Sequence, residues 1–98
     1  NKLKLKQVND LICENPVKIF GIKNKGYLKE NYDADITIVD LNKSIKIKNE
    51  DIQSKCGWSP FHGYSFKGSP IATIINGKIK MLNGKIIGQP EGQPLDFN

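Results

Sequence analysis

The sequence predicts an α+β fold in which helical segments precede a small antiparallel sheet. Three observations support this prediction. Apolar residues recur at helical spacing before residue 22, strand-like runs rich in Ile follow it, and the dipeptide Asn-Gly occurs twice near the end of the chain. The 98 residues suffice for one domain at most, with a modest core. The change of pattern near residue 22 indicates a boundary between two structural units.

Residues 1–22 are predicted to form two short helices. The apolar residues of the first share one helical face: Leu5, Val8, Leu11 and Ile12. A residue that precedes Pro avoids the α region, so the first helix is expected to end near Glu14. Asn15 would then cap a second helix that begins at Pro16. Gly21 would end this helix in a left-handed conformation.

Strands are predicted for the rest of the chain up to residue 87. Residues 36–39 are almost continuously β-branched, which predicts a buried strand. Residues 44–48 alternate Ile with Lys, which is typical of a strand with one solvated face. The dipeptides at 76–77 and 83–84 predict two type I′ hairpins and a three-stranded meander, because both central residues of such a turn need positive φ. We expect four or five strands in all, and an extended, loosely held tail over residues 88–98.

Composition excludes several classes of partner. The chain has 15 Lys, no Arg and a net charge of +5. Nucleic-acid surfaces rely on clustered basic residues and on Arg, so we predict no nucleic-acid partner. No apolar run approaches the ~20 residues of a membrane helix, so we predict no membrane partner. Cys13 and Cys56 are expected to be free thiols of a cytoplasmic protein. The lysines near the start, Lys2, Lys4 and Lys6, are expected to form a solvated face.

Residues 54–68 contain the only Trp, the only His and one of the two Cys. A zinc site needs three or four converging ligands, and Cys56 and His62 have no further ligand near them in the sequence. We therefore predict neither a metal site nor a Cys-His catalytic pair. The same segment carries four large aromatic side chains, which indicate a loop that docks on the chain's own core or on a neighbouring domain: Trp58, Phe61, Tyr64 and Phe66.

Two acidic pairs were considered as candidate sites. Asp33 and Asp35 could form a paired-carboxylate site, but Asp before a strand more often bonds local backbone amides in a turn, and we favour that interpretation. Glu50 and Asp51 are expected in a solvated turn or at a helix start. From residue types alone, we assign no catalytic, cofactor-binding or metal-ligating residue in this chain.

Three stretches resemble the C-terminal end of the cyclic amidohydrolases, and most closely the dihydroorotases. NPVKIFGI (15–22) resembles the family's Asn-Pro-Ala-Lys-hydrophobic-Phe-Gly segment. GYLKENYDADITIVDL (26–41) resembles its Gly-x-Asp-Ala-Asp passage, although Asn31-Tyr32 replace a small-residue turn. SKCGWSPFHGYSFKGSPIATIINGKI (54–79) resembles a passage of dihydroorotases and allantoinases, in which a Glu usually stands at the position of His62.

The resemblance implies a metal-dependent parent enzyme with a (β/α)8 barrel and a small composite β-sandwich. Residues 1–22 would hold the last barrel helices, residues 23–87 the C-terminal strands of the sandwich, and residues 88–98 the extended tail. The parent would use zinc-bound hydroxide to open the cyclic amide of dihydroorotate in pyrimidine biosynthesis. All catalytic residues and zinc ligands would lie upstream, so the fragment by itself should bind no zinc and be inactive.

The resemblance leaves alternatives open. The parent could instead be an allantoinase or dihydropyrimidinase, or a non-catalytic homologue that serves as a scaffold. A free-standing β-module that binds a protein partner is a weaker choice. We expect the chain to begin partway through a longer polypeptide, whose N-terminal remainder covers an apolar face left open here. A homo-oligomer of the parent is also expected.

Overall fold

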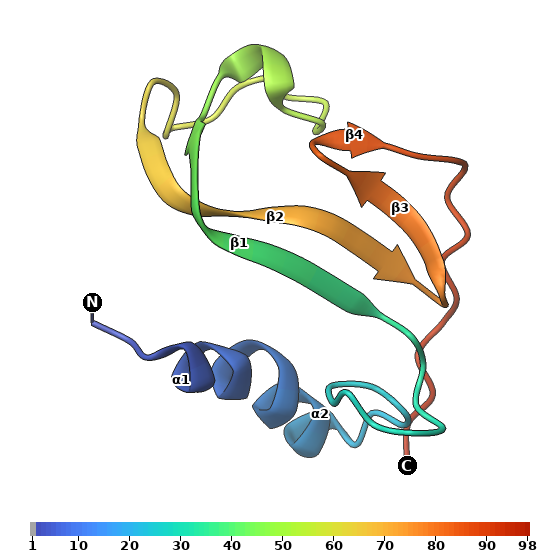
Figure 1. Ribbon diagram of the computed structural model, residues 1–98. Helices are drawn as coiled ribbons and strands as arrows, with labels where there is room; N and C mark the ends of the chain where they lie inside the picture. The colour runs from blue at the N-terminus through green and yellow to red at the C-terminus, as the bar shows by residue number, and fades with distance from the viewer. Residues whose placement is uncertain (1) are drawn as a thin grey trace.

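The computed structural model describes residues 2–98 and places a helical segment apart from a four-stranded antiparallel sheet (Figure 1). The elements follow the predicted order of helices and then strands. In sequence they are α1 (Leu5–Asn9), the π-helix η1 (Asp10–Glu14), α2 (Asn15–Phe20), β1 (Ile36–Lys46), the 3-10 helix η2 (Asn49–Asp51), β2 (Ser65–Ile75), β3 (Lys78–Leu82) and β4 (Lys85–Ile86). No helix among these residues is long and apolar enough to cross a membrane.

The predicted break between two helices is wrong. Asn15 has φ −64° and ψ −45°, so the chain runs from α1 through η1 into α2 without leaving the α region. The amide of Asn15 donates to the carbonyl of Asp10, five residues earlier. Such a widened turn accommodates Pro16, which lacks an N–H and whose ring would collide with a carbonyl of a regular helix. The predicted end of the helix at Gly21 is confirmed, because Gly21 has φ 64° and ψ 38°, which is the left-handed conformation.

The sheet is a simple meander in the order β1-β2-β3-β4, with all neighbours antiparallel. Both predicted Asn-Gly hairpins are confirmed. In the first turn φ is 50° at Asn76 and 77° at Gly77, and in the second it is 50° at Asn83 and 84° at Gly84. Residues 36–39 and 44–48 were expected as separate strands, but β1 spans most of both. A register shift between Asp40 and Ser44 bends the strand where the prediction placed a break.

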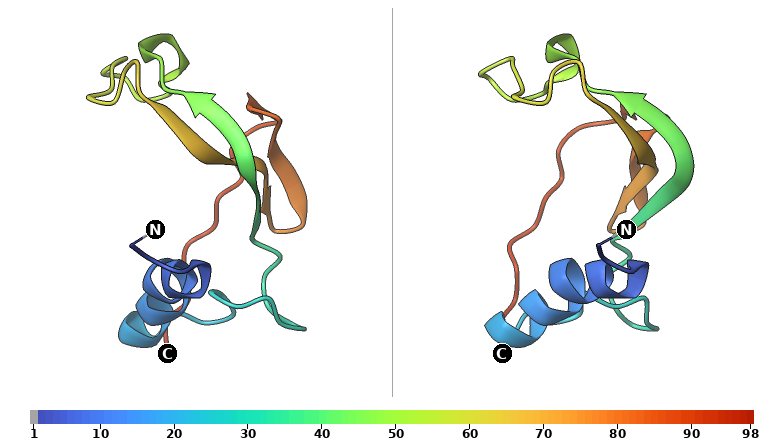
Figure 2. Two further views of the ribbon diagram at one scale, coloured as in Figure 1. Left: turned by 60° about the vertical axis from the view of Figure 1, so that its left-hand side comes forward. Right: turned by 90° about the vertical axis from the view of Figure 1, so that its left-hand side faces the viewer.

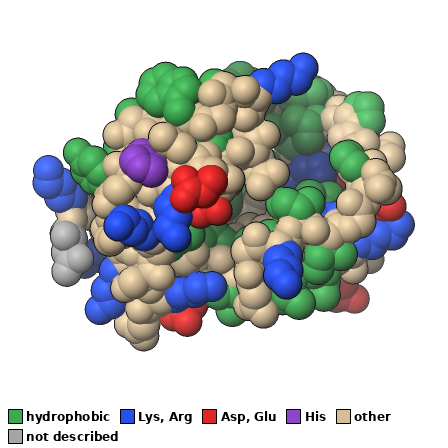
Figure 3. All heavy atoms as spheres, turned by 90° about the horizontal axis from the view of Figure 1, so that it is seen from above, with side chains coloured by type: hydrophobic (Ala, Val, Ile, Leu, Met, Phe, Trp, Pro, Cys, Tyr) green, Lys and Arg blue, Asp and Glu red, His purple; other side chains and the backbone are tan. Residues whose placement is uncertain are grey.

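The predicted burial of residues 36–39 is wrong for the described chain. Ile38 is 45% exposed and Val39 48%. Among residues 2–98 only Ala72 and Ser69 are buried, and many large apolar side chains face solvent. Figure 3 shows hydrophobic side chains interspersed with lysines over the face seen from above. One curved sheet and one helical segment do not cover each other, so the described residues leave extensive apolar surface open.

The tail is extended, as predicted, but its end is not loose. It leaves β4 and returns to the end of α2, away from the sheet (Figure 2). There Phe97 pairs with Ile22 in an antiparallel bridge. The amide of Lys23 donates to the carbonyl of Asp96 at 2.8 Å, and that of Asn98 to Gly21 at 2.7 Å. These backbone bonds were missed because they join residues from opposite ends of the chain.

Candidate functional site

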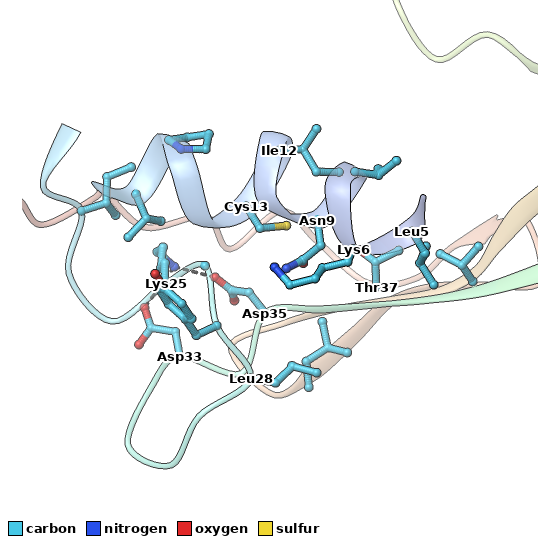
Figure 4. Close-up of a pocket in the computed structure, with 18 residues that line it drawn as sticks. Leu5, Lys6, Asn9, Ile12, Cys13, Lys25, Leu28, Asp33, Asp35 and Thr37 are labelled. Atoms are coloured by element: carbon cyan, nitrogen blue, oxygen red, sulfur yellow. Dashed lines mark hydrogen bonds and ion pairs between the residues drawn. The ribbon is translucent and has the colours of Figure 1, made fainter. Parts of the chain in front are cut away.

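The main cavity is a cleft of about 920 Å³ between the helical segment and the start of β1 (Figure 4). Its lining is mainly apolar and comes from the helices, from the linker between α2 and β1 (residues 21–35) and from β1. The apolar lining includes Leu5, Ile12, Val17, Leu28, Ile36 and Val39. Lys25, Asp33 and Asp35 converge at one end of it, and further polar side chains line it elsewhere: Lys6, Asn9 and Thr37. The cleft therefore has the character of an uncovered packing surface with one charged margin.

Lys25 joins the two aspartates that the sequence singled out. Its Nζ lies 3.0 Å from Asp33 Oδ2 and 2.5 Å from Asp35 Oδ2. The other oxygen of Asp35 accepts the backbone N–H of Asn76 at 2.9 Å. The hydrogen bond from Lys25, followed by that from Asn76, lowers the pKa of Asp35. The same pairing, first with Asp35 and then with Asp33, raises the pKa of Lys25.

These contacts correct the interpretation of Asp35 as a local turn residue. Asp35 does bond a backbone amide, but the amide belongs to the β2–β3 turn rather than to a neighbour in sequence. The two carboxylates lie close together, as a paired site would require, yet they share one lysine. A general base works best with a pKa near the operating pH, and the pKa of Asp35 moves the other way. The cluster is thus suited to holding structure, not to moving protons.

Lys25 and Asn76 are the residues that sequence reasoning missed. Lys25 lies 10 positions before Asp35, and Asn76 lies 41 positions after it. No periodic pattern spans such separations. The sequence shows only that Lys25 and Gly26 precede Asp33-Ala34-Asp35, and such a stretch by itself indicates no more than a turn.

Cys56 and His62 have separate structural partners. The thiol of Cys56 lies 3.1 Å from Ser54 Oγ and 3.6 Å from the carbonyl of Trp58. The hydrogen bond with Ser54, and then that with Trp58, lowers its pKa. His62 Nδ1 accepts the N–H of Asn49 at 2.9 Å, which ties η2 to the loop. Within residues 2–98 no hydrogen bond joins the thiol to the imidazole, so the geometry gives no nucleophile–base pair.

The side chains of residues 2–98 do not form a binding site for a metal ion. No group of three or more His, Cys, Asp or Glu lies close enough to share one, as far as the described chain extends. Asp33 and Asp35 are occupied by Lys25, and His62 presents its Nδ1 to a backbone amide. Cys13 is a half-buried free thiol on the wall of the cleft. We therefore derive no catalytic step from these side chains.

Three aromatic side chains of the 54–68 segment pack on one another. Phe61 lies 5.9 Å from Tyr64 and 6.1 Å from Phe66 between ring centroids. All three remain exposed, as does Trp58 at 58%. Residues 65–68, expected in the loop, belong to β2 instead. The loop thus presents an aromatic surface, and its docking partner stays a prediction.

Two smaller expectations about charged residues are confirmed. Glu50 and Asp51 lie in η2, where a turn or helix start was expected. Near the start of the chain Lys2, Lys4 and Lys6 are exposed. Lys6 forms an i,i+4 ion pair with Asp10 at 2.9 Å on the surface of the helix.

Comparison with known proteins gives one consistent answer. Residues 1–80 match the sequence profile of the amidohydrolase family. The chain is 42% identical over 93 residues to a dihydroorotase of Pyrococcus furiosus, which covers 95% of this chain and 22% of that protein. It is 38% identical over 94 residues to an allantoinase of Desulfitobacterium hafniense, covering 96% of this chain and 21% of that protein.

Solved structures agree with the sequence comparison. The L-hydantoinase (dihydropyrimidinase) of Arthrobacter aurescens superposes with a TM-score of 0.83 at 32% identity, over 89% of this chain and 20% of that one. The dihydropyrimidinase of Brevibacillus agri gives a TM-score of 0.82 at 27% identity, over 90% and 19%. The chain spans about a fifth of the length of the curated relatives it matches. The chain therefore belongs to the amidohydrolase family, and in sequence it is dihydroorotase-like.

Proposed function

We propose that the protein containing this chain is a dihydroorotase, which hydrolyses the cyclic amide bond of dihydroorotate. The observation that carries this proposal is the 42% identity over 95% of the chain to a dihydroorotase. Further dihydroorotases match at 43% and 44% identity. A single allantoinase stands among the first eight curated relatives, which favours the dihydroorotase assignment.

A second candidate has support of its own. The allantoinase match and the hydantoinase fold likeness favour a cyclic amidohydrolase with another ring as substrate. Ring specificity would be set by barrel loops, which the described chain does not include. A non-catalytic homologue that keeps the fold is the third candidate.

The contribution of this chain to the enzyme would be structural. Residues 1–22 would form the last barrel helices, residues 23–87 a part of the β-sandwich and residues 88–98 an extended tail. The N-terminal remainder of the polypeptide would cover the open apolar surface around β1, and Trp58 and Phe61 would pack between sandwich and barrel. The exposure of Ile38, Val39 and the aromatic loop supports this division.

The same proposal implies a cofactor, an oligomeric state and a cellular compartment. Zinc would be held by side chains outside this chain, because the side chains within it do not fit a metal ion. The parent enzyme would be a cytoplasmic homo-oligomer that acts in pyrimidine biosynthesis. None of these roles requires a catalytic group from residues 2–98.

The test is substrate turnover by the full-length protein. Dihydroorotate, allantoin, dihydrouracil and hydantoin would be assayed as separate substrates, with zinc supplied and then removed by a chelator. We expect metal-dependent hydrolysis of dihydroorotate in preference to the other three. Preference for allantoin or for dihydrouracil would favour the second candidate. If none of the four substrates is hydrolysed, the non-catalytic homologue is favoured.

A further inference from the structure

The helical segment and the sheet do not pack on each other directly. Within residues 2–98 no residue of α1, η1 or α2 has its Cα within 8 Å of a strand residue. Figures 1 and 2 show the helices lying apart from the sheet, with the linker and the tail as the two connections. Within the described chain, their relative position is therefore set by contacts within these connections.

The linker is fixed to the helical segment at Gly26. Its φ is +89°, and a Cβ built there would lie 2.5 Å from Val17 Cγ2 and 3.0 Å from the carbonyl oxygen of Cys13. Only glycine permits this approach of the linker backbone to the helix. The neighbouring residue, Lys25, is thereby held at the surface of the helical segment.

Lys25 ties the start of the linker to its end, and Asp35 ties that end to the sheet. The ammonium group bridges Asp33 and Asp35, and Asp35 accepts the amide of Asn76 in the β2–β3 turn. Two backbone bonds reinforce the arrangement. Gly77 donates its N–H to the carbonyl of Ala34 at 3.0 Å, and the amide of Asp33 donates to the carbonyl of Asn24 at 2.9 Å.

We propose that Lys25 is the central contact of a joint that sets the position of the helical segment relative to the sheet. The joint consists of residues 24–26, 33–35 and 76–77. It lies at the charged end of the apolar cleft, so its geometry also sets how far the cleft opens for whatever packs into it. In this role Lys25 positions other elements and touches no substrate.

The ion pairs of Lys25 give the joint its strength. A lysine that satisfies two carboxylates makes charge-assisted hydrogen bonds, which are stronger than neutral ones. Its side chain is 24% exposed, against 82% for Lys6 in the pair with Asp10, so solvent screens the ammonium group of Lys25 less. The other connection between helices and sheet, the end of the tail, is held to residues 21–23 by backbone bonds, with no ion pair among residues 2–98 at that point.

Hydrogen exchange of single amides in the full-length protein tests the joint. The amide of Gly77 reports on it, because its bond to Ala34 crosses from sheet to linker. Lys25→Met should speed exchange of Gly77 by about tenfold, the order expected when a charged partner is lost at a half-exposed site. Lys25→Arg should stay within about twofold of the wild type, since it keeps the charge and the donors.

Two internal controls separate the joint from general loss of stability. The amide of Asn83 donates to Ile71 at 2.8 Å within the sheet and should keep its wild-type exchange rate. Lys23→Met removes an exposed lysine that forms no ion pair within residues 2–98, and should leave Gly77 unchanged. Unchanged exchange of Gly77 in Lys25→Met, or equal acceleration of Gly77 and Asn83, would overturn the proposal.

A milder variant keeps the test decisive if Lys25→Met does not fold. Asp33→Asn removes one ion pair at 3.0 Å and leaves the pair of Lys25 with Asp35 in place. We expect exchange of Gly77 to rise about threefold, with Asn83 unaffected, because part of the charged contact remains. No acceleration at Gly77 in this variant would equally overturn the proposal.

Discussion

Replacing Gly26 by Ala is the sharpest test of how closely the linker packs on the helices. The new Cβ would lie 2.5 Å from Val17 Cγ2 and 3.0 Å from the carbonyl oxygen of Cys13. The carbonyl belongs to the helix backbone and has no rotamer with which to move away. The linker, the helix or both must therefore shift.

The chain supplies a matched control at Gly63. Its φ is +88°, against +89° at Gly26, but a Cβ there would meet nothing within 4 Å. Each substitution costs about 1–2 kcal/mol in unfolding free energy for a non-glycine residue at positive φ. Only Gly26→Ala adds steric overlap, which costs about 1–3 kcal/mol. The difference between the two variants isolates the packing contact.

Urea unfolding of the full-length protein measures this difference. The m value grows with chain length, and with about 5 kcal/mol/M for a protein several times longer than this chain, the midpoint of Gly26→Ala should lie about 0.2–0.6 M below that of Gly63→Ala. Equal midpoints for the two variants would refute the close approach of linker and helix. So would a midpoint for Gly26→Ala equal to that of the wild type.

Three further predictions follow from the candidate site. The lowered pKa of Asp35 means that its ionised form stabilises the fold above the ordinary carboxyl pKa of about 4, and that this contribution is lost as the pH falls through the lowered value. Asp35→Asn should therefore lower the urea midpoint at pH 7 and match the wild type in strong acid; equal loss at both pH values would contradict the charge argument. His62→Glu should leave turnover by the full-length enzyme unchanged, because a carboxylate can also accept the N–H of Asn49, and a large loss would show that the loop has a catalytic role. The isolated chain should neither bind zinc tightly nor hydrolyse dihydroorotate, as measured by metal titration and product formation, and metal-dependent turnover by it would refute our assignment of all catalysis to other parts of the protein.

Most local features of the fold could be predicted because their causes are local. The Asn-Gly turns at 76–77 and 83–84 need positive φ, and few other dipeptides adopt it readily. Gly21 ends α2 for the same conformational reason.

Features that depend on contacts between distant residues could not be predicted. One local prediction failed as well: Pro16 indicated a break, but η1 absorbs it by widening one turn of a helix that continues. Residues 36–39 have the composition of a buried strand, yet burial depends on a covering surface that composition does not supply. Asp35 was identified, but its partner Asn76 was not, because their separation of 41 residues leaves no periodic signal.

The sequence by itself determined the order of helices and strands, the turns between strands and the family to which the chain belongs. Each of these follows from backbone preferences or from motifs of a few residues. Only the three-dimensional structure decided that one helical segment continues through Pro16, that the tail pairs with residues 21–23 and that Lys25 and Asp35 tie the linker to the turn at Asn76. The last two are matters of distance between segments, and that distance is set by packing and charge in three dimensions, which no local pattern records.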